Sequence, residues 1–190
     1  MSIEKEIAAT AARLIAEEGL EYGPAKHRAL KTLGLPPRSR LPSNDEIEDE
    51  LREYLALFCA GTQPAELRAL RELAATWMER LAEFRPHLTG AVWRGTATRL
   101  NNVHLQLFCD DSKAAEIELI NWNVDYEVGS HGDHDVLLLA APCRPLNETV
   151  TIAMTVLDFD DLRGALKPDA RGRSERGDLT ALKKLLESEA

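Results

Sequence analysis

The chain has 190 residues, of which 44% are hydrophobic and 29% charged, proportions that are ordinary for a globular protein with a buried core. The formal net charge of −9 argues against a general nucleic-acid-binding protein, because affinity for DNA or RNA depends mainly on Lys and Arg side chains that neutralise phosphates. No apolar run approaches the roughly 18 to 20 residues that a membrane-spanning helix needs, and the three cysteines are too widely spaced for a zinc site. We therefore expect a cytoplasmic protein with reduced thiols and no membrane partner.

Four amphipathic helices are predicted in the first 86 residues, and together they predict a helical bundle. Their expected positions are residues 3–18, Pro24 to Gly34, a helix opened by Ser43, and a helix from Pro64 to Phe84. Gly19 suits a left-handed C-cap at the end of the first helix. Ser43 and Glu46 have the spacing of a capping box, in which each side chain binds the other residue's backbone N–H.

From residue 87 onward, short apolar runs with strand-like composition dominate. Strands are expected at 89–94, 102–108, 123–129, 134–141 and 149–157. Residues 111–121 favour a helix, although their EIELI portion alternates well enough to form a strand. The Arg-rich segment 171–176 is expected to be an exposed, mobile connection before a last helix that Asp178 caps. The chain is thus predicted to be α+β, with a helical region at 1–86 and a mixed β-sheet domain with flanking helices at 87–190.

The stretch GTATRLNNVHLQLFCDD, residues 95–111, places a Gly-Thr pair before an alternating strand. A glycine lets the backbone approach a phosphate, and an adjacent hydroxyl and N–H groups can then bind the phosphate oxygens. Two arginines flank this turn, and guanidinium groups are strong phosphate ligands. We therefore expect a nucleotide or small anion to bind here, through Arg94, Gly95, Thr96, Arg99, His104 and Gln106.

The longer segment LTGAVWRGTATRLNNVHLQLF resembles the start of the polymerase-beta-like nucleotidyltransferase superfold, in which a Gly-Ser or Gly-Gly pair ends a strand and opens a helix. The resemblance implies that Gly95 and Thr96 fill this pair and that the next strand carries two metal-binding carboxylates at alternating positions. His104 and Gln106 occupy those positions, and neither side chain replaces a hard, anionic magnesium ligand. The resemblance therefore implies a nucleotidyltransferase-like fold without its usual metal carboxylates, acting as a nucleotide-, anion- or protein-binding module.

Two other functions stay open at this stage. An active nucleotidyltransferase would need Mg²⁺ at a rearranged site, for which Asp110, Asp111 and Asp125 are the catalytic candidates. Asp110 and Asp111 are adjacent, so a continuing strand would direct them to opposite faces. A DNA-binding regulator would use the basic residues between Lys26 and Arg40. The NDEIEDE run that follows them is acidic and would be repelled by phosphates, so DNA is not an expected partner.

A third candidate group lies in SHGDHD, where His131, Asp133 and His134 fall within four residues. Imidazole and carboxylate groups at a hairpin tip can bind zinc or another transition metal. Loop tips are also commonly polar simply because they face water. We favour the solvated tip and keep the three residues as metal-ligand candidates.

Overall fold

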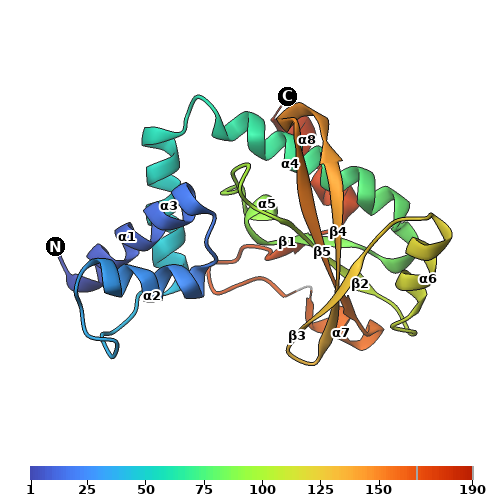
Figure 1. Ribbon diagram of the computed structural model, residues 1–190, viewed down its shortest axis with the longest axis horizontal. Helices are drawn as coiled ribbons and strands as arrows, with labels where there is room; N and C mark the ends of the chain where they lie inside the picture. The colour runs from blue at the N-terminus through green and yellow to red at the C-terminus, as the bar shows by residue number, and fades with distance from the viewer. Residues whose placement is uncertain (166, 190) are drawn as a thin grey trace. The chain divides into compact units, whose positions relative to one another are not determined.

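The computed structural model describes residues 1–165 and 167–189 and has an α+β architecture (Figure 1). The chain divides into two compact units, Met1–Ala65 and Glu66–Ala190. This division lies earlier in the chain than the boundary expected after residue 86. The reason is that the fourth helix, α4 (Gln63–Arg80), contributes Leu70, Met78 and neighbouring residues to the same hydrophobic core as the sheet.

The first unit contains three helices rather than the expected bundle of four: α1 (Ile3–Glu18), α2 (Tyr22–Thr32) and α3 (Asn44–Phe58). Local signals set their ends. Gly19 adopts the left-handed conformation that ends α1, with φ 71°. The capping box at the start of α3 has both of its bonds, because the Ser43 hydroxyl accepts the Glu46 N–H and the Glu46 carboxylate accepts the Ser43 N–H. Ile7, Ile47 and Leu51 are fully buried between the helices.

The second unit continues from α4 through short helices and six strands. In chain order these are η1 (Ala82–Phe84), β1 (His87–Thr89), α5 (Gly90–Arg94), β2 (Val103–Phe108), α6 (Ala114–Asn121), β3 (Glu127–His131), β4 (His134–Cys143), η2 (Arg144–Leu146), β5 (Glu148–Leu157), α7 (Phe159–Ala165), β6 (Arg176–Gly177) and α8 (Leu179–Ser188). The strands expected at 102–108, 134–141 and 149–157 are confirmed, as are the helix within 111–121 and the last helix with its Asp178 cap.

Two expected strands and one expected mobile segment differ from the structure. In the strand expected at 89–94, only Thr89 is in a strand, as the last residue of β1, and residues 90–94 form helix α5. A five-residue helix is too short to show helical periodicity in the sequence. The strand expected from residue 123 begins only at Glu127. The Arg-rich segment does not stay unstructured to its end, because Arg176 and Gly177 pair with β1 as strand β6.

The six strands form one mixed sheet in the order β3-β4-β5-β2-β1-β6. Strands β2 and β5 are parallel, and the other neighbours are antiparallel. In β2 the alternation of side chains places Val103, Leu105 and Leu107 on one face, where all three are buried. His104 and Gln106 lie on the other face and are half-buried.

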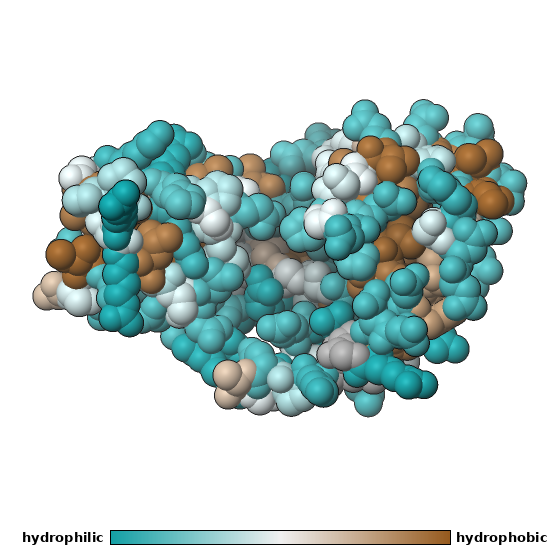
Figure 2. All heavy atoms as spheres, turned by 90° about the horizontal axis from the view of Figure 1, so that it is seen from below, coloured by the Kyte–Doolittle hydropathy of each residue, from teal (hydrophilic) through white to brown (hydrophobic). Residues whose placement is uncertain are grey.

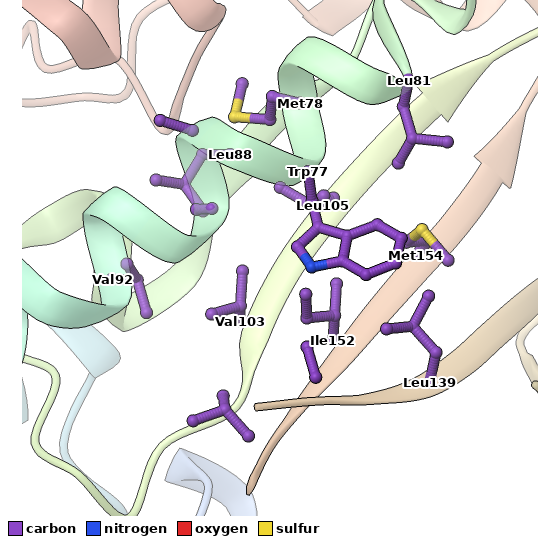
Figure 3. Packing of buried hydrophobic residues seen from close by; sticks show 14 of the residues in the cluster. Trp77, Met78, Leu81, Leu88, Val92, Val103, Leu105, Leu139, Ile152 and Met154 are labelled. Atoms are coloured by element: carbon purple, nitrogen blue, oxygen red, sulfur yellow. The ribbon is translucent and has the colours of Figure 1, made fainter. Parts of the chain in front are cut away.

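Helix α4 covers the apolar face of this sheet. Figure 3 shows Trp77 and Met78 of α4, and Leu81 just after it, above Val103 and Leu105 of β2, with Ile152, Met154 and Leu139 of the neighbouring strands beside them. Met78, Leu81 and Leu105 are at most 1% exposed. The opposite sheet face is therefore the one left with polar side chains.

The surface seen in Figure 2 is mainly hydrophilic, with hydrophobic residues in separate groups. The large exposed hydrophobic side chains of the second unit are Leu100, Ile117, Ile120 and Val128. Within residues 1–165 and 167–189, no helix combines the length and the apolar character needed to cross a membrane.

Candidate functional site

Gly90 is the glycine that ends a strand and opens a helix. It follows Thr89, the last residue of β1, and it begins α5 with φ 74°, a conformation that favours glycine. A Cβ atom at Gly90 would lie 3.5 Å from Cδ2 of His104, so the backbone turn and the β2 side chain directly face each other. The chain therefore passes from a strand through a glycine into a helix at Thr89 and Gly90.

Gly95 and Thr96 close α5 instead of opening a helix. Gly95 is the C-cap, with φ 94°, and the N–H groups of Gly95 and Thr96 both donate to the Ala91 carbonyl, at 2.9 and 3.0 Å. The Thr96 side chain is buried, and its Oγ1 has no hydrogen-bond partner within the described parts of the chain. Because both N–H groups are already used, this turn does not present the phosphate-binding amides that the sequence predicts there.

The two arginines that flank the turn have different surroundings. Arg94 is half-buried at the end of α5. Arg99 is exposed, and its guanidinium binds the Glu148 carboxylate through Nη2 at 2.6 Å and Nε at 3.1 Å, while Nη2 also donates to the Leu146 carbonyl. The hydrogen bond with Glu148 raises the pKa of Arg99 above its ordinary value. Arg99 is therefore committed to a surface ion pair.

Buried Arg71 fixes the end of α5 from the side of α4. Its Nε donates to the Val92 carbonyl at 2.9 Å and its Nη2 to the Trp93 carbonyl at 2.8 Å, while Nη1 pairs with Glu189. Only 5% of the Arg71 side chain is exposed. A cation near the C-terminal carbonyls of a helix is favourable, so Arg71 holds the short helix in place.

His104 and Gln106 lie on the polar sheet face beside Gly90. Strand register pairs His104 with Thr89 of β1 and Ala153 of β5, and directly opposite residues point to the same side. Gln106 is paired in the same way with His87 and with Thr155 of β5. These strand neighbours, Thr89, Ala153, His87 and Thr155, are not carboxylates.

His87 extends this face toward Phe108. The two rings meet edge to face, with centroids 5.3 Å apart. The His87 Nδ1 lies 2.8 Å from the Arg85 carbonyl, and since a carbonyl only accepts, Nδ1 carries the hydrogen.

Arg176 belongs to the candidate site, although it was not among the residues that the sequence predicted there. It lies in β6, paired with Thr89, and its Nη1 donates to the Gln106 side-chain oxygen at 2.5 Å. Its Nε is buried and has no hydrogen-bond partner in the described residues. The arginine-rich composition of 171–176 was the available signal, but nothing local says that a residue 70 positions from Gln106 reaches it. A guanidinium from β6 thus binds the Gln106 side chain of β2.

The three catalytic candidates do not come together as a metal site. Asp110, Asp111 and Asp125 are exposed, and the Asp111 carboxylate accepts the Lys113 N–H at 2.9 Å. Among the residues that the structure describes, no group of three or more His, Cys, Asp or Glu side chains is placed to hold a metal ion. Burial, followed by the charge of Asp111, raises the pKa of the neighbouring Cys109 thiol.

The hairpin tip between β3 and β4 has the expected turn at Gly132, with φ 61°. His131 and His134 are register partners across it, while His131 and Asp133 are exposed. Among the described residues of this tip, no three His, Cys, Asp or Glu side chains are placed to hold a metal ion.

The basic residues of the first unit line a shallow surface groove of about 480 Å³. Its lining residues are Pro24, His27, Arg28, Lys31 and Thr32. Acidic side chains balance part of this charge, because Arg28 pairs with Glu18 at 2.6 Å and Arg40 with Glu4 at 3.0 Å. This pairing lowers the positive field that a DNA backbone would meet.

Comparison with known proteins adds no relatives. The chain matches no protein-family model, and no curated protein matches its sequence significantly.

Proposed function

We propose that residues 66–190 form a nucleotidyltransferase-like domain that has exchanged metal binding for direct binding of an anionic ligand, such as a nucleotide. The ligand would lie on the polar sheet face beside Gly90, near His104 and Arg176. The observation that carries the proposal is the replacement of both alternating β2 carboxylates, together with the hydrogen bond from Arg176 to Gln106.

Charge and close backbone approach support an anion at this place. Arg176 is a permanent cation, and a guanidinium recognises phosphate or carboxylate with strong, directional hydrogen bonds. Gly90 has no side chain, so its backbone lies close to the His104 ring, and a Cβ there would be 3.5 Å from Cδ2. In an active enzyme of the resembled kind, magnesium ions would supply the positive charge, whereas here Arg176 supplies it.

The same residues argue against the two-metal reaction. A neutral amide and an imidazole are poor replacements for the carboxylates that magnesium prefers. The spare carboxylates, Asp110, Asp111 and Asp125, are exposed and do not form a metal-binding group with other described residues. Binding without transfer is therefore the function that this arrangement supports best.

Calorimetric titration of the full chain with ATP, CTP, GTP and UTP, in EDTA and again in Mg²⁺, tests the proposal. We expect at least one nucleotide to bind in EDTA, with a Kd that Mg²⁺ does not lower. A hydrogen bond to a charged group contributes about 1.5–3 kcal/mol, so Arg176→Ala should weaken binding by roughly 10- to 100-fold.

Matched variants separate this site from general charge effects. Arg144→Ala removes an exposed arginine elsewhere in the same unit and should leave the Kd unchanged, while His104→Ala should weaken binding. Absence of binding in EDTA for all four nucleotides would reject the proposal. Mg²⁺-dependent release of pyrophosphate, lost in Asp110→Asn or Asp125→Asn, would favour the enzymatic alternative.

A further inference from the structure

The residues 174–177, called the strap below, bring Arg176 to the candidate site from far along the chain. The strap joins the sheet edge through only two register pairs, Gly177 with Leu88 and Arg176 with Thr89. A two-residue strand has little stability of its own. The position of Arg176 must therefore depend on side-chain contacts that hold the strap.

Trp93, in the last turn of α5, provides two of these contacts. Its indole Nε1 donates to the Ser174 carbonyl at 2.9 Å. Its ring carbons occupy the space beside Gly177, where a Cβ atom would lie only 2.2 to 2.8 Å from them. Glycine at 177 is thus a steric requirement for the strap to lie against the indole. Within the strap, the Ser174 hydroxyl donates to the Arg176 carbonyl at 2.5 Å.

The docked strap also carries an unfavourable interaction. The Arg176 Nη1 has an acceptor in Gln106, but the Nε atom is buried without one among the described residues. A buried donor that lacks an acceptor favours the state in which water reaches it. Docking of the strap is therefore a balance between the Trp93 contacts and the unpaired Arg176 Nε.

We propose that the strap docks and undocks on the candidate site and that an anionic ligand favours the docked state. The docked strap holds the half-buried Arg176 side chain on the candidate site, so a ligand that binds the accessible part of this guanidinium there shifts the equilibrium toward docking by linkage. The contacts of Trp93 and Gly177 then set the fraction of molecules whose strap is docked and can bind the ligand. This inference rests on the proposed function for the ligand, whereas the docking equilibrium can be measured in the absence of any ligand.

Docking is tested first without ligand, by hydrogen exchange and by trypsin cleavage after Arg173 and Arg176 in the full chain. Gly177→Ala should raise strap exchange and cleavage by roughly tenfold, because proteolysis follows the population of the open form. Gly129→Ala is the matched control, since a Cβ there meets nothing closer than 3.9 Å. Trp93→Phe, which removes only the indole N–H donor and part of the ring, should give an intermediate increase.

Ligand coupling is tested on the same peptides with ATP in EDTA. ATP should slow hydrogen exchange of the strap in the wild-type chain and should not do so in Arg176→Ala; trypsin cleavage after Arg176 is compared only among variants that keep this arginine. Gly177→Ala should bind ATP more weakly than Gly129→Ala by about the factor by which its strap is opened.

The failures are distinguishable. Unchanged strap exchange in Gly177→Ala, with circular dichroism unchanged, would overturn the docking inference. ATP binding by the wild-type chain without any protection of the strap would overturn the coupling while leaving the proposed function intact. An absence of ATP binding would overturn the proposed function and the coupling together, and the exchange data without ligand would still decide whether the strap docks.

Discussion

Replacement of Arg71 by methionine is expected to destabilise the second unit strongly, although the two side chains are similar in size. Methionine fills much of the same volume but cannot hydrogen-bond the Val92 and Trp93 carbonyls, which Arg71 reaches at 2.9 and 2.8 Å. Both carbonyls belong to the C-terminal end of α5 and have no helical partner there. The change therefore leaves two buried acceptors unpaired next to the turn that carries the candidate site.

The magnitude follows from the two carbonyl bonds. Hydrogen bonds to charged groups contribute about 1.5–3 kcal/mol each, while the variant avoids burying a guanidinium. The ion pair with Glu189 adds little, because that carboxylate is 34% exposed and such pairs are worth about 0–1 kcal/mol. We expect a net loss of about 2–4 kcal/mol in the free energy of unfolding.

Urea unfolding followed by tryptophan fluorescence measures this loss, since Trp77, Trp93 and Trp122 all lie in the second unit. With an m-value of about 1–3 kcal/mol per molar urea, the midpoint should fall by roughly 1–2 M. Arg68→Met is the control, because Arg68 is 40% exposed and pairs with Glu72 on the helix surface. A midpoint for Arg71→Met equal to that of Arg68→Met would refute the reasoning.

Two further predictions use the pKa shifts. Burial, and after it the charge of Asp111, raises the pKa of the Cys109 thiol, so little of the reactive thiolate is present at pH 8. Alkylation of Cys109 at pH 8 should therefore be much slower than alkylation of half-buried Cys59, and equal rates would contradict this. The pKa of the Asp169 carboxyl is lowered mainly by the hydrogen bond from the Arg173 backbone N–H, and also by the one from the Arg171 N–H. The carboxylate therefore stabilises the turn at 169–173 fully above pH 3.8, the ordinary pKa of Asp. This stabilisation is lost as the pH falls through the lower pKa that Asp169 has in the folded protein. The amide NMR shifts of both arginines should titrate with a midpoint below 3.8, and a midpoint above it would refute the account.

Helix boundaries were the most predictable part of the fold. The caps at Gly19, Ser43 and Asp178 each use hydrogen bonds that span only three or four residues, so their signals lie together in the sequence. The apolar stripe of α4 was equally clear. A stripe, however, does not identify the segment against which it packs, and in the structure α4 shares a hydrophobic core with the sheet.

The candidate site was predicted in part. His104 and Gln106 were placed on the face that meets a glycine turn, and the structure brings His104 against Gly90. The structure places Gly95 and Thr96 at the end of the short helix α5, which could not be told from a strand in the sequence. Its position decides which glycine opens a helix and which closes one.

The sequence by itself determined the helix caps and the α+β class, because each depends on residues close together in the chain. Only the tertiary structure decided that β5 lies parallel to β2, that α4 covers the sheet, and that Arg176 reaches Gln106. These features depend on pairing between segments far apart in sequence. Such pairing is selected by how well whole faces bury one another, which local patterns do not encode.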